Sequence, residues 1–155
     1  MYLRSFRISW WLASVSLMAL AFVILFFPVE SEDLPMYLAL ARRIWSEGQL
    51  LDVDPFLFTL KNYHWTISHQ WLSYLLFYGI FQISEWDSIV IFKTLFLISL
   101  PLMLLVSAWR RQVLHFIPFV LIVLALGSSS WRFIEKSAMF SDVFTVLLLL
   151  ILLDA

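Results

Sequence analysis

Acidic residues gather in one stretch of the chain, residues 30–70, and two of them could do chemistry at a membrane surface. Glu32 and Asp33 follow directly after a long apolar run. A carboxylate at such a boundary between lipid and water could bind a metal ion or act as a general base on an acceptor hydroxyl. Asp33 is also a good cap for a helix that begins after it, with Glu32 then simply solvated. The sequence favours capping and leaves catalysis open.

A second acidic pair, Asp52 and Asp54, is separated by a single residue. Alternate residues of an extended segment share one face, so the two carboxylates could hold a divalent cation such as Mg²⁺ or Mn²⁺. Such pairs also occur by chance, and that alternative stays open. The chain has no cysteine, which excludes disulfides, iron–sulfur clusters and thiolate zinc sites.

Two histidines, His64 and His69, flank Trp65 in the same stretch. Their spacing does not place them on one helical face and no third ligand is specified, so a role in holding a phosphate or sugar is favoured over metal ligation. Loop histidines beside aromatic residues are more often packing or hydrogen-bonding groups, and that alternative stays open. Trp65 offers a flat face to a sugar ring, or it belongs to an interfacial aromatic belt. The basic side chains that could stabilise a phosphate nearby are Lys61, Arg42 and Arg43.

The composition of the chain indicates which class of protein must hold these residues in place. Of 155 residues, 63% are hydrophobic and only 14% are charged. Ordinary soluble domains are roughly 45–50% apolar and about 25% charged, so a soluble globular domain is excluded, and so are disordered and nucleic-acid-binding proteins. We therefore predict an all-α integral membrane bundle of about four or five transmembrane helices, with membrane lipids as its surroundings.

Apolar runs mark the expected helices within one transmembrane region that covers residues 1–155. Residues 8–28 carry no charge and predict a retained transmembrane helix, because the run is too long for a signal peptide. Further membrane helices are expected within 71–155. The apolar runs there are 71–83, 89–109, 113–126 and 138–153, with a break predicted at residues 127–130.

Orientation depends on the basic residues beside these runs. Arg4 and Arg7 precede the first run closely, which favours a cytoplasmic N-terminus and an extracytoplasmic loop over residues 29–70. The later basic residues are equally compatible with two topologies, one with five membrane crossings and one in which residues 71–83 form a re-entrant segment. With five crossings, Arg110 and Arg111 are outside, whereas a re-entrant segment moves them inside and exports Arg132 and Lys136.

A short surface helix is predicted inside the loop. Asp33 is a suitable N-cap and Gly48 a suitable C-terminal cap. The apolar residues between them recur at helical spacing, whereas Arg42 and Arg43 fall on the other face. Such an amphipathic helix can lie at the membrane surface.

Two charged residues, Lys93 and Asp142, fall inside apolar runs. Charges in a bilayer are costly and usually face a partner or a water-filled cavity. They could pair with each other, sit near the membrane ends with their charged groups reaching the interface, or line a permeation path. They therefore support an alternative function, that of a non-catalytic membrane module or transporter subunit.

A series of short motifs resembles a known family. Asp33, Tyr37 and Ala41 precede Gly48, and then come Asp54-Pro55-Phe56-Leu57-Phe58-Thr59, Trp65 and His69-Gln70-Trp71-Leu72. In order and spacing these residues resemble the N-terminal part of the GT-C class of multi-pass membrane glycosyltransferases, in particular a bacterial group. Met139-Phe140-Ser141 is similar to a corresponding Phe-Ser pair in that group.

This resemblance implies a function and a location. It implies transfer of a sugar from a polyprenyl-phosphate-linked donor to a lipid, glycan or protein on the extracytoplasmic side of the bacterial inner membrane. Asp33 matches the catalytic carboxylate, with Glu32 adjacent, and His69, His64, Trp65, Arg42, Arg43 and Lys61 are the candidate donor-binding residues. Members of the class are longer, so this chain is expected to be an N-terminal part that does not catalyse transfer alone. Gln70 stands where Glu is common.

Overall fold

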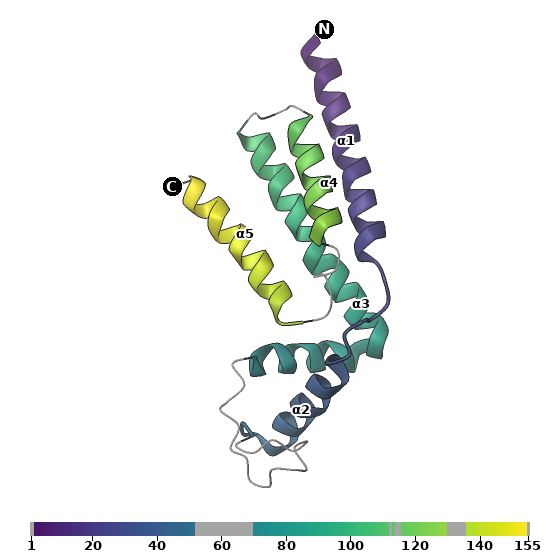
Figure 1. The fold of residues 1–155 in the computed structure, drawn as a ribbon, viewed down its shortest axis with the longest axis vertical. Coiled ribbons are helices and arrows are strands. Elements are labelled where there is room, and N and C mark those ends of the chain that lie inside the picture. The colour runs from purple at the N-terminus through teal and green to yellow at the C-terminus, as the bar shows by residue number, and fades with distance from the viewer. Residues whose placement is uncertain (1, 52–69, 112, 114–115, 130–135, 155) are drawn as a thin grey trace. The chain divides into compact units, whose positions relative to one another are not determined.

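The computed structural model describes residues 2–51, 70–111, 113, 116–129 and 136–154. Within these ranges the chain is helical and contains no strand, which confirms the all-α prediction (Figure 1). The helices are α1 (Tyr2–Leu25), α2 (Leu34–Glu47), α3 (Trp71–Arg110), α4 (Ile117–Ser129) and α5 (Ala138–Asp154). They form two compact units. One comprises Met1–Glu30 with Val90–Ala155, and the other comprises Ser31–Ile89.

Helix α3 is interrupted by a kink at Ser84 and Glu85. Ser84 has φ −154° and ψ 39°, and Glu85 has φ 49° and ψ −129°. A positive φ is rare for a residue with a side chain and strains the backbone by about 1–3 kcal/mol. The hydroxyl of Ser88 lies 2.7 Å from the carbonyl oxygens of both Ile80 and Glu85, so it can donate to either side of the kink. The kink falls in the gap between the predicted runs 71–83 and 89–109.

In the first unit, α1 runs antiparallel to the second part of α3, residues 90–110. At one end Trp11 lies against Trp109, with ring centroids 6.3 Å apart. Toward the other end, the hydroxyl of Thr94 lies 3.3 Å from the carbonyl oxygen of Leu25. Since these pairs join the start of α1 to the end of α3 and the reverse, the two helices point in opposite directions (Figure 1).

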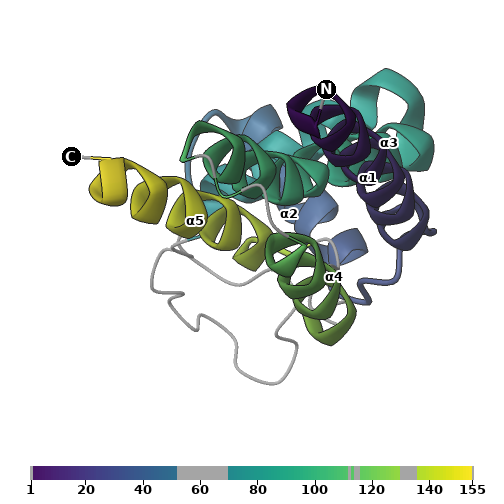
Figure 2. The same cartoon turned by 90° about the horizontal axis from the view of Figure 1, so that it is seen from above.

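Helices α4 and α5 complete this unit (Figures 1 and 2). Trp10 of α1 meets Phe119, near the start of α4, edge-on at 5.9 Å. Phe140 of α5 packs against Phe96 of α3 at 5.1 Å. Because the chain turns back after α3, α4 is antiparallel to it and α5 is parallel to it again. The start of α1 and the end of α5 consequently lie toward the same end of the unit.

Lys93 is fully buried and joins α3 to the end of α1. Its ammonium donates a hydrogen bond of 2.9 Å to the carbonyl oxygen of Phe27 and lies 3.5 Å from the centroid of the Phe27 ring. Carbonyl groups at the end of a helix have no partner within the helix, so a buried donor there satisfies a group that would otherwise be costly. Asp142, the other charge within an apolar run, is half-buried on α5.

Some predicted boundaries were wrong. The predicted run 113–126 becomes helical only from Ile117, which puts Pro118 in the first turn of α4, where proline is tolerated. The helix then continues through Gly127 to Ser129, although a break was predicted there. In the described part of the chain, α3 alone combines the length and apolar character needed to cross a membrane. Shorter apolar helices occur at Ser9–Leu25, Ile117–Ser128 and Ala138–Leu153.

Candidate functional site

Helix α2 carries Asp33 at its start, as the sequence predicted. Asp33 occupies the N-cap position and Pro35 lies in the first turn, where its missing N–H costs nothing. Gly48 ends the helix with φ 68°, and its N–H donates to the carbonyl oxygen of Ile44 at 2.9 Å. This left-handed conformation suits glycine and closes the last turn. The predicted helix between Asp33 and Gly48 is thus confirmed.

The packing of α2 against the first part of α3 fixes the position of Asp33 within the second unit. Leu40, Ala41 and Tyr74 form a buried cluster. The ring of Tyr37 stacks on Tyr74, with centroids 4.4 Å apart and planes 14° from parallel. Further along both helices, Trp45 meets Tyr78 at 6.4 Å. These contacts lie at two places along α2 and pack it against the first part of α3.

Asp33 interacts through its side chain with a tyrosine and not with the helix backbone. The hydroxyl of Tyr37 donates to Oδ2 of Asp33 over 3.4 Å, and the carboxylate makes no side-chain capping hydrogen bond. The expectation that this side chain caps the helix was therefore wrong. The reason is that Asp33 has helical backbone angles, φ −81° and ψ −20°, whereas a capping side chain normally needs an extended residue.

The same arrangement occurs on α3. The hydroxyl of Tyr74 donates to Oε1 of Gln70 over 3.3 Å, one helical turn before it. The stacked tyrosines thus each donate to the polar side chain that precedes them by one turn. Sequence reasoning missed Tyr74, although a polar residue four positions before a tyrosine occurs at both Asp33 and Gln70.

Burial and charge keep the Tyr37 phenol neutral. Desolvation is the main cause that raises the pKa of Tyr37 to about 12, followed by the negative charge of Asp33, by Tyr74 and by the hydrogen bond to Asp33. The phenol is therefore a hydrogen-bond donor at all ordinary pH values. It donates to the half-buried carboxylate of Asp33, and a carboxylate is a group that can act as a general base. Glu32 beside it is exposed.

The arginines predicted to hold phosphate lie on the exposed side of α2. Arg42 and Arg43 are both exposed, as the helical pattern indicated. Nε of Arg43 forms an ion pair of 2.6 Å with Glu47, one turn later. An exposed pair of this kind contributes roughly 0.3–0.5 kcal/mol to helix stability and does not hold the arginine firmly. Neither arginine belongs to the packed face that carries Tyr37.

The other predicted site residues lie outside the described residues, and their predictions stay open. These are Asp52, Asp54, Lys61, His64, Trp65 and His69. Among residues that the structure does describe, no three of the His, Asp and Glu side chains come close enough to hold a metal ion. Comparison with known proteins finds no match to a family model, to a curated protein or to a solved structure.

Proposed function

We propose that this chain is the N-terminal part of a GT-C-like membrane glycosyltransferase in which Asp33 is the general base. The observation that carries the proposal is the half-buried Asp33 carboxylate, oriented by a neutral Tyr37 at the start of the helix that follows the first apolar helix. The motif series from Asp33 to Leu72 supports the same family. The substrates are a polyprenyl-phosphate-linked sugar and a hydroxyl of a lipid, glycan or protein.

The reaction is a displacement at the anomeric carbon of the sugar. The oxygen of the acceptor hydroxyl attacks the anomeric carbon while Asp33 takes the proton of that hydroxyl. The bond from the anomeric carbon to the oxygen of the donor phosphate breaks at the same time. The leaving lipid phosphate then needs positive charge or hydrogen-bond donors. Arg42, His69 and Lys61 are the proposed sources, and a divalent cation on Asp52 and Asp54 would serve the same purpose.

Helix directions support four crossings of the bacterial inner membrane. We take α1, residues 86–110 of α3, α4 and α5 as the spanning helices. Their alternating directions put Arg4 and Arg7 on the same side as Arg110 and Arg111. Cytoplasmic loops are rich in Lys and Arg, so this side is the cytoplasmic one. In this topology Asp33 follows the extracytoplasmic end of α1 along the chain, and Lys136 precedes the extracytoplasmic end of α5.

The alternative function is that of a non-catalytic membrane module or transporter subunit, with Lys93 and Asp142 as charges along a permeation path. The contact of Lys93 with the main chain and the ring of Phe27 favours a structural role for this lysine, in holding α3 against the end of α1.

The test is the substitution Asp33→Asn in the natural full-length protein. We expect membranes that contain the variant to transfer labelled sugar from a polyprenyl phosphate about 100-fold more slowly or worse, since general bases contribute about 10²–10⁴-fold. Asp87→Asn is the matched control, because Asp87 is an exposed acid elsewhere on α3. Transfer at the normal rate in the Asp33→Asn protein refutes the assignment. Resistance of the protein to carbonate extraction tests the membrane location separately.

A further inference from the structure

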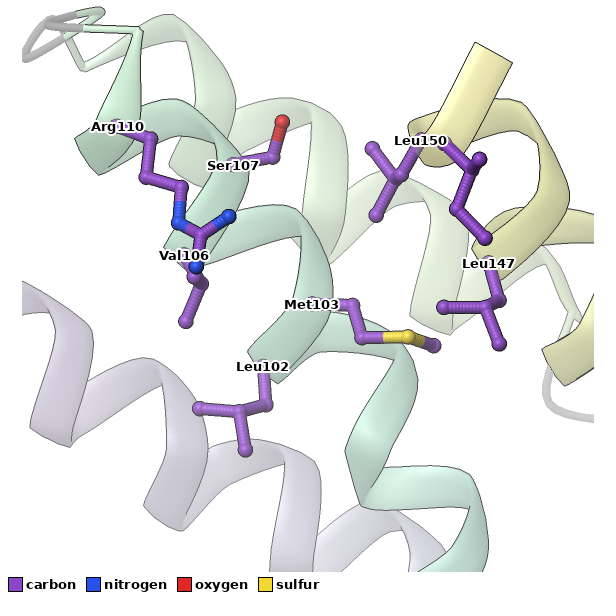
Figure 3. Close-up of a pocket in the computed structure, with 8 residues that line it drawn as sticks. Leu102, Met103, Val106, Ser107, Arg110, Leu147 and Leu150 are labelled. Carbon is purple, nitrogen blue, oxygen red and sulfur yellow. The ribbon is translucent and has the colours of Figure 1, made fainter. Parts of the chain in front are cut away.

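An open groove of about 640 Å³ lies in the first unit, between the second part of α3 and α5. Its walls are apolar, with Met103 and Val106 on one side and Leu147 and Leu150 on the other (Figure 3). Ser107 and Arg110 supply its polar groups. The volume lies within the range of about 300–1,000 Å³ that is typical of small-molecule sites.

Arg110 gives the groove one charged end. Figure 3 shows the guanidinium reaching along α3 toward Val106, beside the apolar wall. Among residues that the structure describes, no carboxylate forms an ion pair with Arg110. An apolar channel that ends at a cation is complementary to an amphiphile with an apolar chain and an anionic head. Arginine is particularly suited to phosphate, because its planar guanidinium can donate two parallel hydrogen bonds.

Two tryptophans mark the depth of this charged end. Trp109 precedes Arg110 and is 48% exposed, and its partner Trp11 on α1 is 56% exposed. Exposed tryptophans of membrane proteins concentrate at the level of the lipid headgroups. Met103 lies about two helical turns, roughly 10 Å, below Arg110 along α3. The groove therefore runs from headgroup depth toward the hydrocarbon, as a lipid molecule does.

We propose that this groove binds one anionic phospholipid of the surrounding membrane. The lipid phosphate accepts hydrogen bonds from Arg110 and Ser107, and one acyl chain lies between Val106 and Leu147. The proposal rests on the membrane location given above, but it does not depend on sugar transfer. Helix α5 carries no predicted site residue, and in this proposal it forms the second wall of the lipid site.

Native mass spectrometry of the purified full chain tests the proposal. The probes are phosphatidylglycerol and phosphatidylcholine with identical acyl chains, so that only the net charge of the headgroup differs. We expect phosphatidylglycerol to bind about tenfold more tightly, which corresponds to about 1.4 kcal/mol. Arg110→Gln should abolish this preference, whereas the matched control Arg111→Gln should retain it. Val106→Trp should lower the occupancy of both lipids by filling the channel, and inorganic phosphate should not displace either.

Three results would overturn the inference. These are an undiminished preference in Arg110→Gln, an equal loss in both arginine variants, and a dimer that forms disulfide cross-links through Leu147→Cys. The last result would show that a second copy covers the groove.

Failure of this proposal is distinguishable from failure of the proposed function. A membrane-embedded protein that shows no Arg110-dependent lipid binding refutes only the lipid site, whereas normal transfer by Asp33→Asn refutes only the catalytic assignment.

Discussion

Replacing Ala41 with leucine should disturb the packing that positions Asp33. Ala41 is completely buried between α2 and α3, in the same cluster as Tyr74. A leucine side chain needs space that this contact does not have, so α2 must move away from α3 or the side chains must leave their preferred rotamers. Either change separates the stacked rings of Tyr37 and Tyr74.

The magnitude follows from two losses. Overpacking of a well-packed core costs about 1–3 kcal/mol, and the loss of a stacked aromatic pair costs about 0.5–1.5 kcal/mol. Together they predict that the free energy of unfolding falls by about 1.5–4.5 kcal/mol. At roughly 2–4 °C per kcal/mol for a chain of this size, the melting temperature should fall by about 3–18 °C.

Thermal unfolding in detergent, followed by the near-ultraviolet circular dichroism of the aromatic residues, measures this effect. Ala39→Leu is the matched control, because Ala39 lies two positions earlier on the same helix and is exposed. Its stability should change by no more than about 0.5 kcal/mol. Sugar transfer should also fall in the Ala41→Leu protein and not in the control. Equal melting temperatures for the two variants would refute the packing of α2 against α3 through Ala41.

Further predictions concern the remaining features of the second unit. Tyr37 should titrate near pH 12, and the step in tyrosinate absorbance near this pH should vanish in Tyr37→Phe. The pKa of the Tyr37 phenol in the folded state is raised above the ordinary value of 10.0. Its contribution to the free energy of unfolding is therefore complete below pH 10 and is lost as the pH rises toward 12. Gly48→Ala should destabilise the protein by about 1 kcal/mol, measured by chemical unfolding, because Gly48 has a positive φ. Glu85→Gly should stabilise it by about 1 kcal/mol, since glycine adopts that backbone conformation without strain, and a loss of stability would argue against the kink geometry.

Local sequence signals predicted α2 and the interruption of α3. The Asp33 and Gly48 caps and the helical spacing between them depend on nearby residues alone, and so does the polar gap between residues 83 and 89. The side-chain partners could not be predicted in the same way. The contact between Lys93 and Phe27 joins residues far apart in the sequence, and the sequence alone gave no reason to prefer a main-chain carbonyl over Asp142.

The candidate site was predicted only in part. Asp33 was selected from its position after the first apolar run, and its link to Tyr37 could have been found from their spacing of one helical turn. The stacking of Tyr37 on Tyr74 could not have been predicted, because it depends on how α2 and α3 pack against each other. Arg42 and Arg43 illustrate the opposite case, in which the helical pattern predicted their exposure but could not indicate the ion pair of Arg43 with Glu47.

In the proposed membrane topology, the engagement of Lys93 with the end of α1 has a consequence for biogenesis. Its hydrogen-bond acceptor, the Phe27 carbonyl, directly follows the helix that the ribosome synthesises first. When the lysine leaves the translocon within an apolar segment, a charge without a partner would resist entry into lipid. A first helix that is already waiting beside the exit supplies that partner, so the order of synthesis is also the order in which the two helices can pair at least cost. Deleting residues 1–28 should therefore impair insertion of the segment that contains Lys93, and Lys93→Leu should restore it.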